Sequence, residues 1–196
     1  MRELTMKELR DRIRAEGQNL GDGILKIDSL LNHQVDTRLI MRCGEEIARR
    51  FRDDGVTRVL TAEVSGIAPA FATAYVLGVP LVYARKVKPI TMYGPVYLET
   101  APSHTKGVEV NLLVSAEFLP PNERVLIIDD FLASGRTLKG LIRIVRSARS
   151  TVVGVACIVE KTFEQGRQVL EPFGVRIESL VVITSMENGQ IVFADD

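Results

Sequence analysis

Two adjacent carboxylates, Asp129 and Asp130, directly follow the apolar run at residues 125–128. This order is typical of a buried strand that ends in an acid pair, and carboxylates there can accept hydrogen bonds from the hydroxyl groups of a sugar. Neighbouring residues of a strand face opposite ways, so we expect the pair to open the turn after the strand. Taken alone, such a pair is more often a solvated turn than a binding site.

The residues after the acid pair could bind a phosphate. Backbone N–H groups and two hydroxyl groups gather there at the expected N-terminus of a helix, where anions are stabilised. The residues concerned are Ala133, Ser134, Gly135, Arg136 and Thr137. A sugar and a phosphate held one turn apart describe a ribose 5-phosphate. The alternative, that Ser134 and Gly135 only cap a helix, does not explain the complete order of apolar run, acid pair, small loop and helix.

Other phosphate and catalytic motifs are absent from the sequence. It contains no P-loop, no GxSxG, no HExxH and no EF-hand loop. The segment "GDGILK" at residues 21–26 lacks the third glycine of a dinucleotide fingerprint.

Composition limits the class of protein. The chain has 196 residues, 46% of them hydrophobic and 26% charged, which is typical of a soluble enzyme of one domain. Its 25 basic and 25 acidic residues cancel, so we expect no nucleic-acid or membrane partner. Cys43 and Cys157 lie far apart, and the charged N-terminus does not resemble a signal peptide. These features predict a reduced, cytoplasmic protein.

Strands and helices alternate along most of the chain and must position these groups. Expected strands cover residues 58–63, 79–86, 108–119, 124–130, 151–161 and 176–184. Expected helices cover residues 36–55, 68–77, 135–148 and 164–173. The alternation predicts an α/β fold with a mostly parallel central sheet flanked by helices on both faces.

Four segments fall outside this rhythm. Residues 4–17 have helical spacing and residues 24–30 look extended, so the part before Asp36 is expected to form a separate cap. Residues 86–107 predict a hairpin or a long mobile loop. The tail is expected to form a hairpin around Asn188 and Gly189.

The string "VLIIDDFLASGRT" resembles the phosphoribosyl pyrophosphate (PRPP) signature of the type I phosphoribosyltransferases. The stretches "ILKIDSLLNHQVD", "VSGIAPA", "LVYARKVK" and "IVEKTFEQGR" extend the resemblance along nearly the whole chain. The first and last of these are similar to the bacterial branch that uses xanthine. The resemblance implies the type I phosphoribosyltransferase fold, as a single domain over residues 1–196, with about 1–35 forming a hood over the base pocket.

The implied activity belongs to purine salvage. The 5-phosphoribosyl group of PRPP would pass to N9 of xanthine, giving xanthosine 5'-monophosphate and pyrophosphate. Two alternatives remain open: the same chemistry with guanine, hypoxanthine or adenine preferred, and a non-catalytic regulator that senses PRPP. Such a regulator usually brings a DNA-binding module or a basic face, and only about 35 residues precede the expected sheet.

The resemblance also assigns roles at the PRPP site. The acid pair Asp129 and Asp130 is catalytic and binds the ribose hydroxyls, while residues 133–137 bind the 5-phosphate. Residues assigned to the pyrophosphate are Ser65, Gly66, Arg85, Lys86 and Lys88. Three charges after a strand can instead be a solvated edge. Mg²⁺ is expected to bind with PRPP, and no protein ligand is assigned to it.

Leu25, Asn32 and Lys161 are implied to contact the purine, and Phe131 could stack on its ring. The alternatives are a salt bridge from Lys161 to Glu160 or Glu164, a turn or cap role for Asn32, and a core position for Phe131. The resemblance further implies a homodimer with a shared active site, and a loop within residues 86–107 that closes over the reacting centre.

Overall fold

The computed structural model describes residues 2–102 and 109–196. Its main sheet has six strands in the order β10-β9-β8-β7-β3-β4. The strands are β3 (Arg58–Ala62), β4 (Leu81–Ala84), β7 (Arg124–Leu132), β8 (Thr151–Lys161), β9 (Ile177–Ser185) and β10 (Val192–Phe193). All neighbours are parallel except β10 and β9. The predicted mostly parallel sheet is therefore confirmed.

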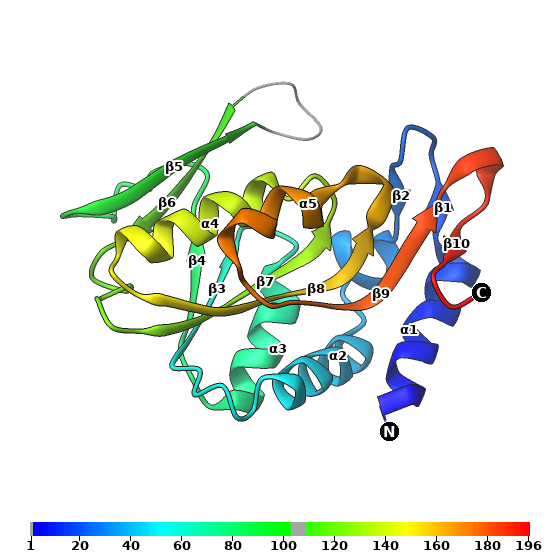
Figure 1. Ribbon diagram of the computed structural model, residues 1–196, viewed down its shortest axis with the longest axis horizontal. Helices are drawn as coiled ribbons and strands as arrows, with labels where there is room; N and C mark the ends of the chain where they lie inside the picture. The colour runs from blue at the N-terminus through cyan, green and yellow to red at the C-terminus, as the bar shows by residue number, and fades with distance from the viewer. Residues whose placement is uncertain (1, 103–108) are drawn as a thin grey trace.

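Helices cover both faces of this sheet (Figure 1). In Figure 1, α2 (Thr37–Arg50) and α3 (Ile67–Leu77) lie below the sheet, and α4 (Arg136–Ser147) and α5 (Gly166–Leu170) lie above it. β7 is central because its apolar run is fully buried between the two layers, as strands of a parallel sheet require. The predicted N-cap of α2 is also present, since the Asp36 side chain accepts a hydrogen bond from Leu39 N at 3.1 Å.

The N-terminal segment packs onto the lower layer. It comprises α1 (Arg2–Glu16), the short hairpin of β1 (Gln18–Asn19) and β2 (Leu25–Lys26), and the π-helical turn η1 (Asp28–Asn32). Leu9 and Ile13 of α1 are buried in the same cluster as the apolar face of α2. The prediction of an extended segment over residues 24–30 is wrong beyond Lys26. Leu30 and Leu31 are both buried, which a helical turn allows and an alternating strand does not.

A separate hairpin is formed by β5 (Val96–Pro102) and β6 (Glu109–Ser115). The expectation that residues 108–119 join the parallel alternation is wrong, because β6 pairs with β5 and makes only an isolated bridge, Arg85 with Leu113, towards β4. The hairpin instead packs on α4, where a β-carbon on Gly140 would lie 2.7 Å from Leu112 Cδ1. Residues 103–108 of the loop expected to close over the reacting centre lie outside the described residues.

The remaining expectations are met in part. The helix predicted over residues 164–173 is divided into η2 (Thr162–Glu164), α5 and η3 (Glu171–Phe173), with Gln165 at a φ of 61° between the first two. The tail turns through η4 (Glu187–Gly189), and β10 returns antiparallel to β9, which confirms the hairpin. Cys43 and Cys157 are free and buried. Among the described residues, no helix has the length and apolar character needed to cross a membrane.

Candidate functional site

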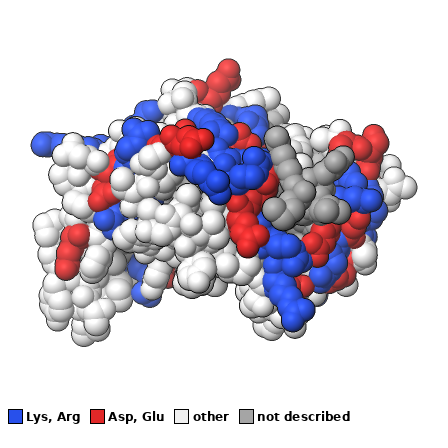
Figure 2. All heavy atoms as spheres, turned by 90° about the horizontal axis from the view of Figure 1, so that it is seen from below, with Lys and Arg blue, Asp and Glu red and all other residues white. Residues whose placement is uncertain are grey.

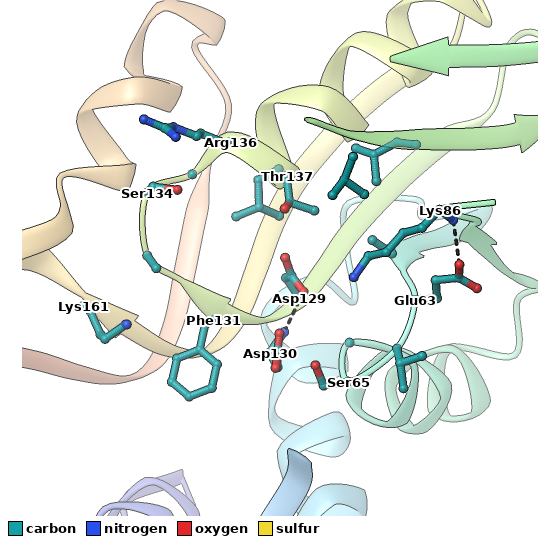
Figure 3. A pocket seen from close by; sticks show the side chains of 18 of the residues that line it. Glu63, Ser65, Lys86, Asp129, Asp130, Phe131, Ser134, Arg136, Thr137 and Lys161 are labelled. Atoms are coloured by element: carbon teal, nitrogen blue, oxygen red, sulfur yellow. Dashed lines mark hydrogen bonds between the residues drawn. The ribbon is translucent and has the colours of Figure 1, made fainter. Parts of the chain in front are cut away.

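A cavity of about 350 Å³ lies at the carboxyl ends of β3, β7 and β8, which is the usual ligand position in parallel sheets (Figure 3). Most of the residues assigned from the sequence line it. They are Leu25, Ser65, Gly66, Lys86, Asp129, Asp130, Phe131, Ala133, Ser134, Gly135, Arg136, Thr137 and Lys161. Asn32, Arg85 and Lys88 do not line it.

The acid pair lies within β7, which continues two residues beyond the expected end of this strand at residue 130. The expectation that the pair opens the turn is wrong, because β7 continues to pair with β8 through Phe131 and Leu132. Asp129 is buried, and its Oδ1 accepts a hydrogen bond from Asp130 N at 3.0 Å. Asp130 is half-buried, and its Oδ2 accepts a hydrogen bond from Asn32 Nδ2 at 2.9 Å. The two carboxylates therefore have different surroundings.

Burial raises the pKa of Asp129 well above its ordinary value of 3.8, and the adjacent charge of Asp130 raises it further. The positive charge of Lys86 opposes this shift in part. Figure 3 shows the Lys86 side chain extended towards Asp129. Asp129 therefore keeps its proton to a higher pH than a solvated carboxyl group does, and a cation placed beside it would favour ionisation.

The loop after β7 has the geometry of an anion site. Gly135 precedes α4 with a φ of 71°, a conformation that favours glycine, and α4 begins at Arg136. The backbone N–H groups at this N-terminus have no partner within the helix and can point towards an anion. In Figure 3, Ser134 lies on the loop and Thr137 faces the interior, whereas Arg136 points away from the acid pair.

The turn after β3 approaches the acid pair closely. A β-carbon on Gly66 would lie 2.4 Å from Thr61 Oγ1 and 3.0 Å from Asp129 Oδ1. Only glycine fits this position, and its backbone borders the cavity directly beside Ser65. The peptide bond between Glu63 and Val64, at the start of the turn, is cis.

Of the basic cluster, only Lys86 reaches the cavity. Arg85 Nε lies 2.7 Å from Glu63 Oε2, and its guanidinium group lies over the Tyr83 ring. Glu63 also accepts a hydrogen bond from Lys86 N at 2.6 Å. Lys88 is exposed. Glu63 follows β3 and Arg85 follows β4, so the parallel pairing of these two strands brings the two side chains together.

Lys161 is buried at the side of the cavity that faces the β1–β2 hairpin. Its Nζ donates to Gly23 O at 2.8 Å, forms an ion pair with Glu164, and lies 5.6 Å from the centroid of the Phe131 ring. The salt bridge with Glu164, weighed as an alternative from the sequence, is therefore present together with exposure to the cavity. Figure 3 shows the Phe131 ring beside Lys161 at the cavity, and Phe131 is half-buried because it also packs against the core.

Sequence reasoning missed a turn beside the cavity and a part of the cavity lining. The first is the glycine turn before β2, with positive φ at Gly21, Asp22 and Gly23, which brings the Gly23 carbonyl to Lys161. The segment "GDG" carries this signal, although it fails as a dinucleotide fingerprint. The second is apolar: Ile24, Ala62, Val110, Leu112 and Leu138.

Within residues 2–102 and 109–196, no group of three or more His, Cys, Asp or Glu side chains could hold a metal ion. The carboxylates of Asp129 and Asp130 at the cavity fit a cation whose remaining ligands come from a bound molecule, since Mg²⁺ prefers oxygen ligands and is commonly held by one or two carboxylates plus phosphates.

The family model and the similar proteins all point to phosphoribosyltransferases. Residues 27–182 match the phosphoribosyl transferase domain family. The xanthine phosphoribosyltransferase of Deinococcus deserti is 50% identical over 184 residues, covering 94% of this chain and 95% of the relative. That of Stutzerimonas stutzeri is 46% identical over 190 residues, covering 97% of this chain and 100% of the relative.

Solved structures show the same fold. The adenine phosphoribosyltransferase of Rhodothermus marinus has a TM-score of 0.74 and 26% identity, covering 92% of this chain and 99% of that one. The adenine phosphoribosyltransferase of Giardia lamblia, solved with 9-deazaadenine, has a TM-score of 0.74, with 21% identity and coverage of 90% and 98%.

Proposed function

The chain belongs to the phosphoribosyltransferase family, and on this basis we propose that it is a xanthine phosphoribosyltransferase of purine salvage. It transfers the 5-phosphoribosyl group of PRPP to N9 of xanthine and releases pyrophosphate. The observation that carries the proposal is that one cavity joins an acid pair, an anion-binding loop and a buried lysine. Relatives named xanthine phosphoribosyltransferase match nearly the whole chain, which supports the choice of base.

PRPP would lie along the carboxyl end of the sheet. Loop 133–137 binds the 5-phosphate at the N-terminus of α4, and Asp129 and Asp130 accept hydrogen bonds from the ribose hydroxyls. The pyrophosphate lies against Ser65 and Gly66 with Lys86 beside it. Mg²⁺ that enters with PRPP would supply positive charge for the pyrophosphate, and Asp129 and Asp130 are the carboxylates at the cavity that could help to hold it. A cation there would also favour the ionised form of Asp129, whose pKa is raised by burial and by the charge of Asp130.

The reaction breaks the bond from the ribose C1 to pyrophosphate and forms the bond from C1 to N9. Positive charge develops on the ribosyl group as the leaving group departs. The protein contributes by holding the reactants in line and by placing carboxylate charge beside the ribosyl group and lysine charge beside the pyrophosphate.

The base is proposed to lie between Phe131 and the hood. Xanthine is readily anionic, so a buried cation such as Lys161 is a suitable partner, and the Asn32 amide can bind an oxo group. Lys161 is already paired with Glu164, which reduces the net charge at this end of the cavity. Leu25 supplies apolar contact. The part of residues 1–35 around the β1–β2 turn serves as the hood.

A homodimer with a shared active site is part of the proposal. α3 has no charged residue, and it exposes Phe71 and Tyr75, whose rings stack with centroids 6.4 Å apart. Figure 2 views the molecule from the side of α2 and α3 and shows a broad area without charged side chains there. β4 is the edge strand beside it, so Arg85 and Lys88 lie where they could reach the partner's pyrophosphate site. A cytoplasmic location is proposed with it.

Pyrophosphate release tests the function. The protein would be given Mg²⁺ and PRPP with xanthine, guanine, hypoxanthine or adenine in turn. We expect the highest kcat/KM with xanthine. A higher kcat/KM with another base would keep the reaction but overturn the base assignment. Tight PRPP binding without turnover of any base would favour a PRPP-sensing regulator.

A further inference from the structure

The phosphate loop is backed by a glycine of another element. Gly166, the first residue of α5, is buried against the loop, and a β-carbon on it would lie 2.1 Å from Ala133 O and 2.9 Å from Gly135 N. A β-carbon on Gly135 would in turn lie 2.7 Å from Gly166 O. Figure 1 shows α5 beside the turn from β7 into α4. The position of residue 166 therefore limits the conformations open to loop 133–137.

The residue after Gly166 is anchored to the sheet. Arg167 donates from Nε and Nη2 to the two carboxylate oxygens of Glu160, at 2.8 and 2.6 Å. Glu160 is only 2% exposed and also accepts a hydrogen bond from Ser179 Oγ at 2.6 Å. Such a two-point ion pair fixes direction as well as distance. α5 is a single short turn that begins after Gln165, whose φ is 61°, and its buried Leu170 packs in the core, so the Arg167 ion pair is the polar contact that fixes its first turn to β8.

Glu160, the partner of Arg167, lies at the end of β8 that borders the phosphate loop. Glu160 pairs in register with Leu132, the residue before the loop, and Lys161 follows it directly. Because neighbouring residues of a strand face opposite sides, Glu160 faces α5 and Lys161 faces the hood and the base pocket. Two adjacent residues of β8 therefore serve different parts of the proposed site. Glu160 acts on the phosphate loop through Arg167, and Lys161 lies at the base pocket.

We propose that Arg167 is a positioning residue of the PRPP site: its ion pair with Glu160 holds Gly166 against loop 133–137 and so keeps the 5-phosphate cradle in its binding conformation. The inference rests on the proposed function for its kinetic consequences. Arg167 itself does not line the cavity. It acts through the backbone of Gly166.

Arg167→Met tests the inference against a matched control, Arg176→Met. Arg176 also places two guanidinium nitrogens on one carboxylate, that of Glu178, and is 44% exposed against 50% for Arg167. It precedes β9, at the opposite end of the sheet from the cavity. We expect Arg167→Met to raise KM for PRPP about tenfold and to leave KM for xanthine within about twofold, with both unchanged in Arg176→Met.

Hydrogen exchange gives a second readout that needs no substrate. The backbone amides of residues 134–137 should exchange faster in free Arg167→Met than in the wild type or Arg176→Met. Equal increases of both KM values, or unchanged PRPP KM with unchanged exchange, would overturn the proposal. If the wild type turned over no base, the proposed function would fail, and the exchange comparison would still decide the role of Arg167.

Arg167→Lys covers the case in which the methionine variant does not fold. Lysine keeps the charge but makes a single-point contact, so we expect partial recovery, with KM for PRPP about threefold above the wild type. Values and exchange rates identical to those of the wild type would show that the two-point geometry is not needed and would sink the proposal.

Discussion

The side-chain amide of Asn32 donates a 2.9 Å hydrogen bond to Asp130 Oδ2, across 98 residues of sequence. One end of this bond belongs to the proposed base site and the other to the proposed ribose site. Asn32 lies just outside the cavity lining, so its amide must turn from Asp130 to reach a base. Whether Asp130 holds the Asn32 amide therefore affects how well the base is bound.

Replacing Asn32 with Ala is expected to raise KM for xanthine about tenfold, because a hydrogen bond to the base is lost. KM for PRPP should change less, since Asp130 remains accessible to water and to the ribose. Steady-state kinetics with each substrate varied in turn would measure both. An unchanged KM for xanthine would remove Asn32 from the base site.

Lys161→Ala is expected to raise KM for xanthine about 100-fold, since it removes a buried cation that binds the base. It also releases the Gly23 carbonyl and leaves Glu164 without this partner, so some loss of stability should accompany it. Lys7→Ala, an exposed lysine of α1, is the control. Equal losses of xanthine and PRPP affinity in Lys161→Ala would contradict the assigned role.

Asp129 gives a pH dependence of stability with a definite sign. Its pKa is raised in the folded protein, so the folded state binds more protons than the unfolded state once the pH exceeds about 4. The free energy of unfolding should therefore fall as the pH rises through this window, and Asp129→Asn should lack this component. Urea unfolding of both proteins between pH 5 and 8 measures the difference. If the free energy of unfolding of the wild type and of Asp129→Asn changed with pH in the same way, the Asp129 carboxyl group would not be desolvated.

Gly66→Ala is expected to lower the free energy of unfolding by about 1–3 kcal/mol through overpacking, and to weaken PRPP binding because the turn must move. The nearest obstacle is Thr61 Oγ1 at 2.4 Å. Adding Thr61→Ala should recover stability more than PRPP affinity, because the approach to Asp129 Oδ1 at 3.0 Å remains. Urea unfolding and calorimetric PRPP titration separate the two effects; full recovery of both would place the clash at Thr61 alone.

Tyr75→Arg should convert the proposed dimer into a monomer, because it puts a charge on the exposed face of α3, which has no charged residue. Light scattering after size exclusion reports the mass. Phe118→Arg changes a similarly exposed aromatic residue outside α3 and should leave the mass unchanged. A Tyr75→Arg protein of dimer mass would mean that α3 is not the interface.

The order of neighbouring residues along the chain was sufficient to predict much of the fold and part of the candidate site. The apolar run, acid pair and small loop at residues 125–137 predict β7, its carboxylates and the start of α4, because each depends on neighbours in sequence. The alternation of strands and helices likewise predicts a parallel sheet covered on both faces. The placement of β6 outside that sheet was not predictable, since its pairing with β5 and packing on α4 depend on long-range contacts.

The partners of the charged residues were decided by tertiary structure. From sequence, Lys161 could pair with Glu160 or Glu164, and only the facing of β8 sends Glu160 to Arg167 and leaves Lys161 for Glu164 and the cavity. The adjacency of β3 and β4 lets Glu63 engage Arg85 and leaves Lys86 for the site. A side chain's chemistry is set by its type, but its partner is set by which strands lie side by side and which face it occupies.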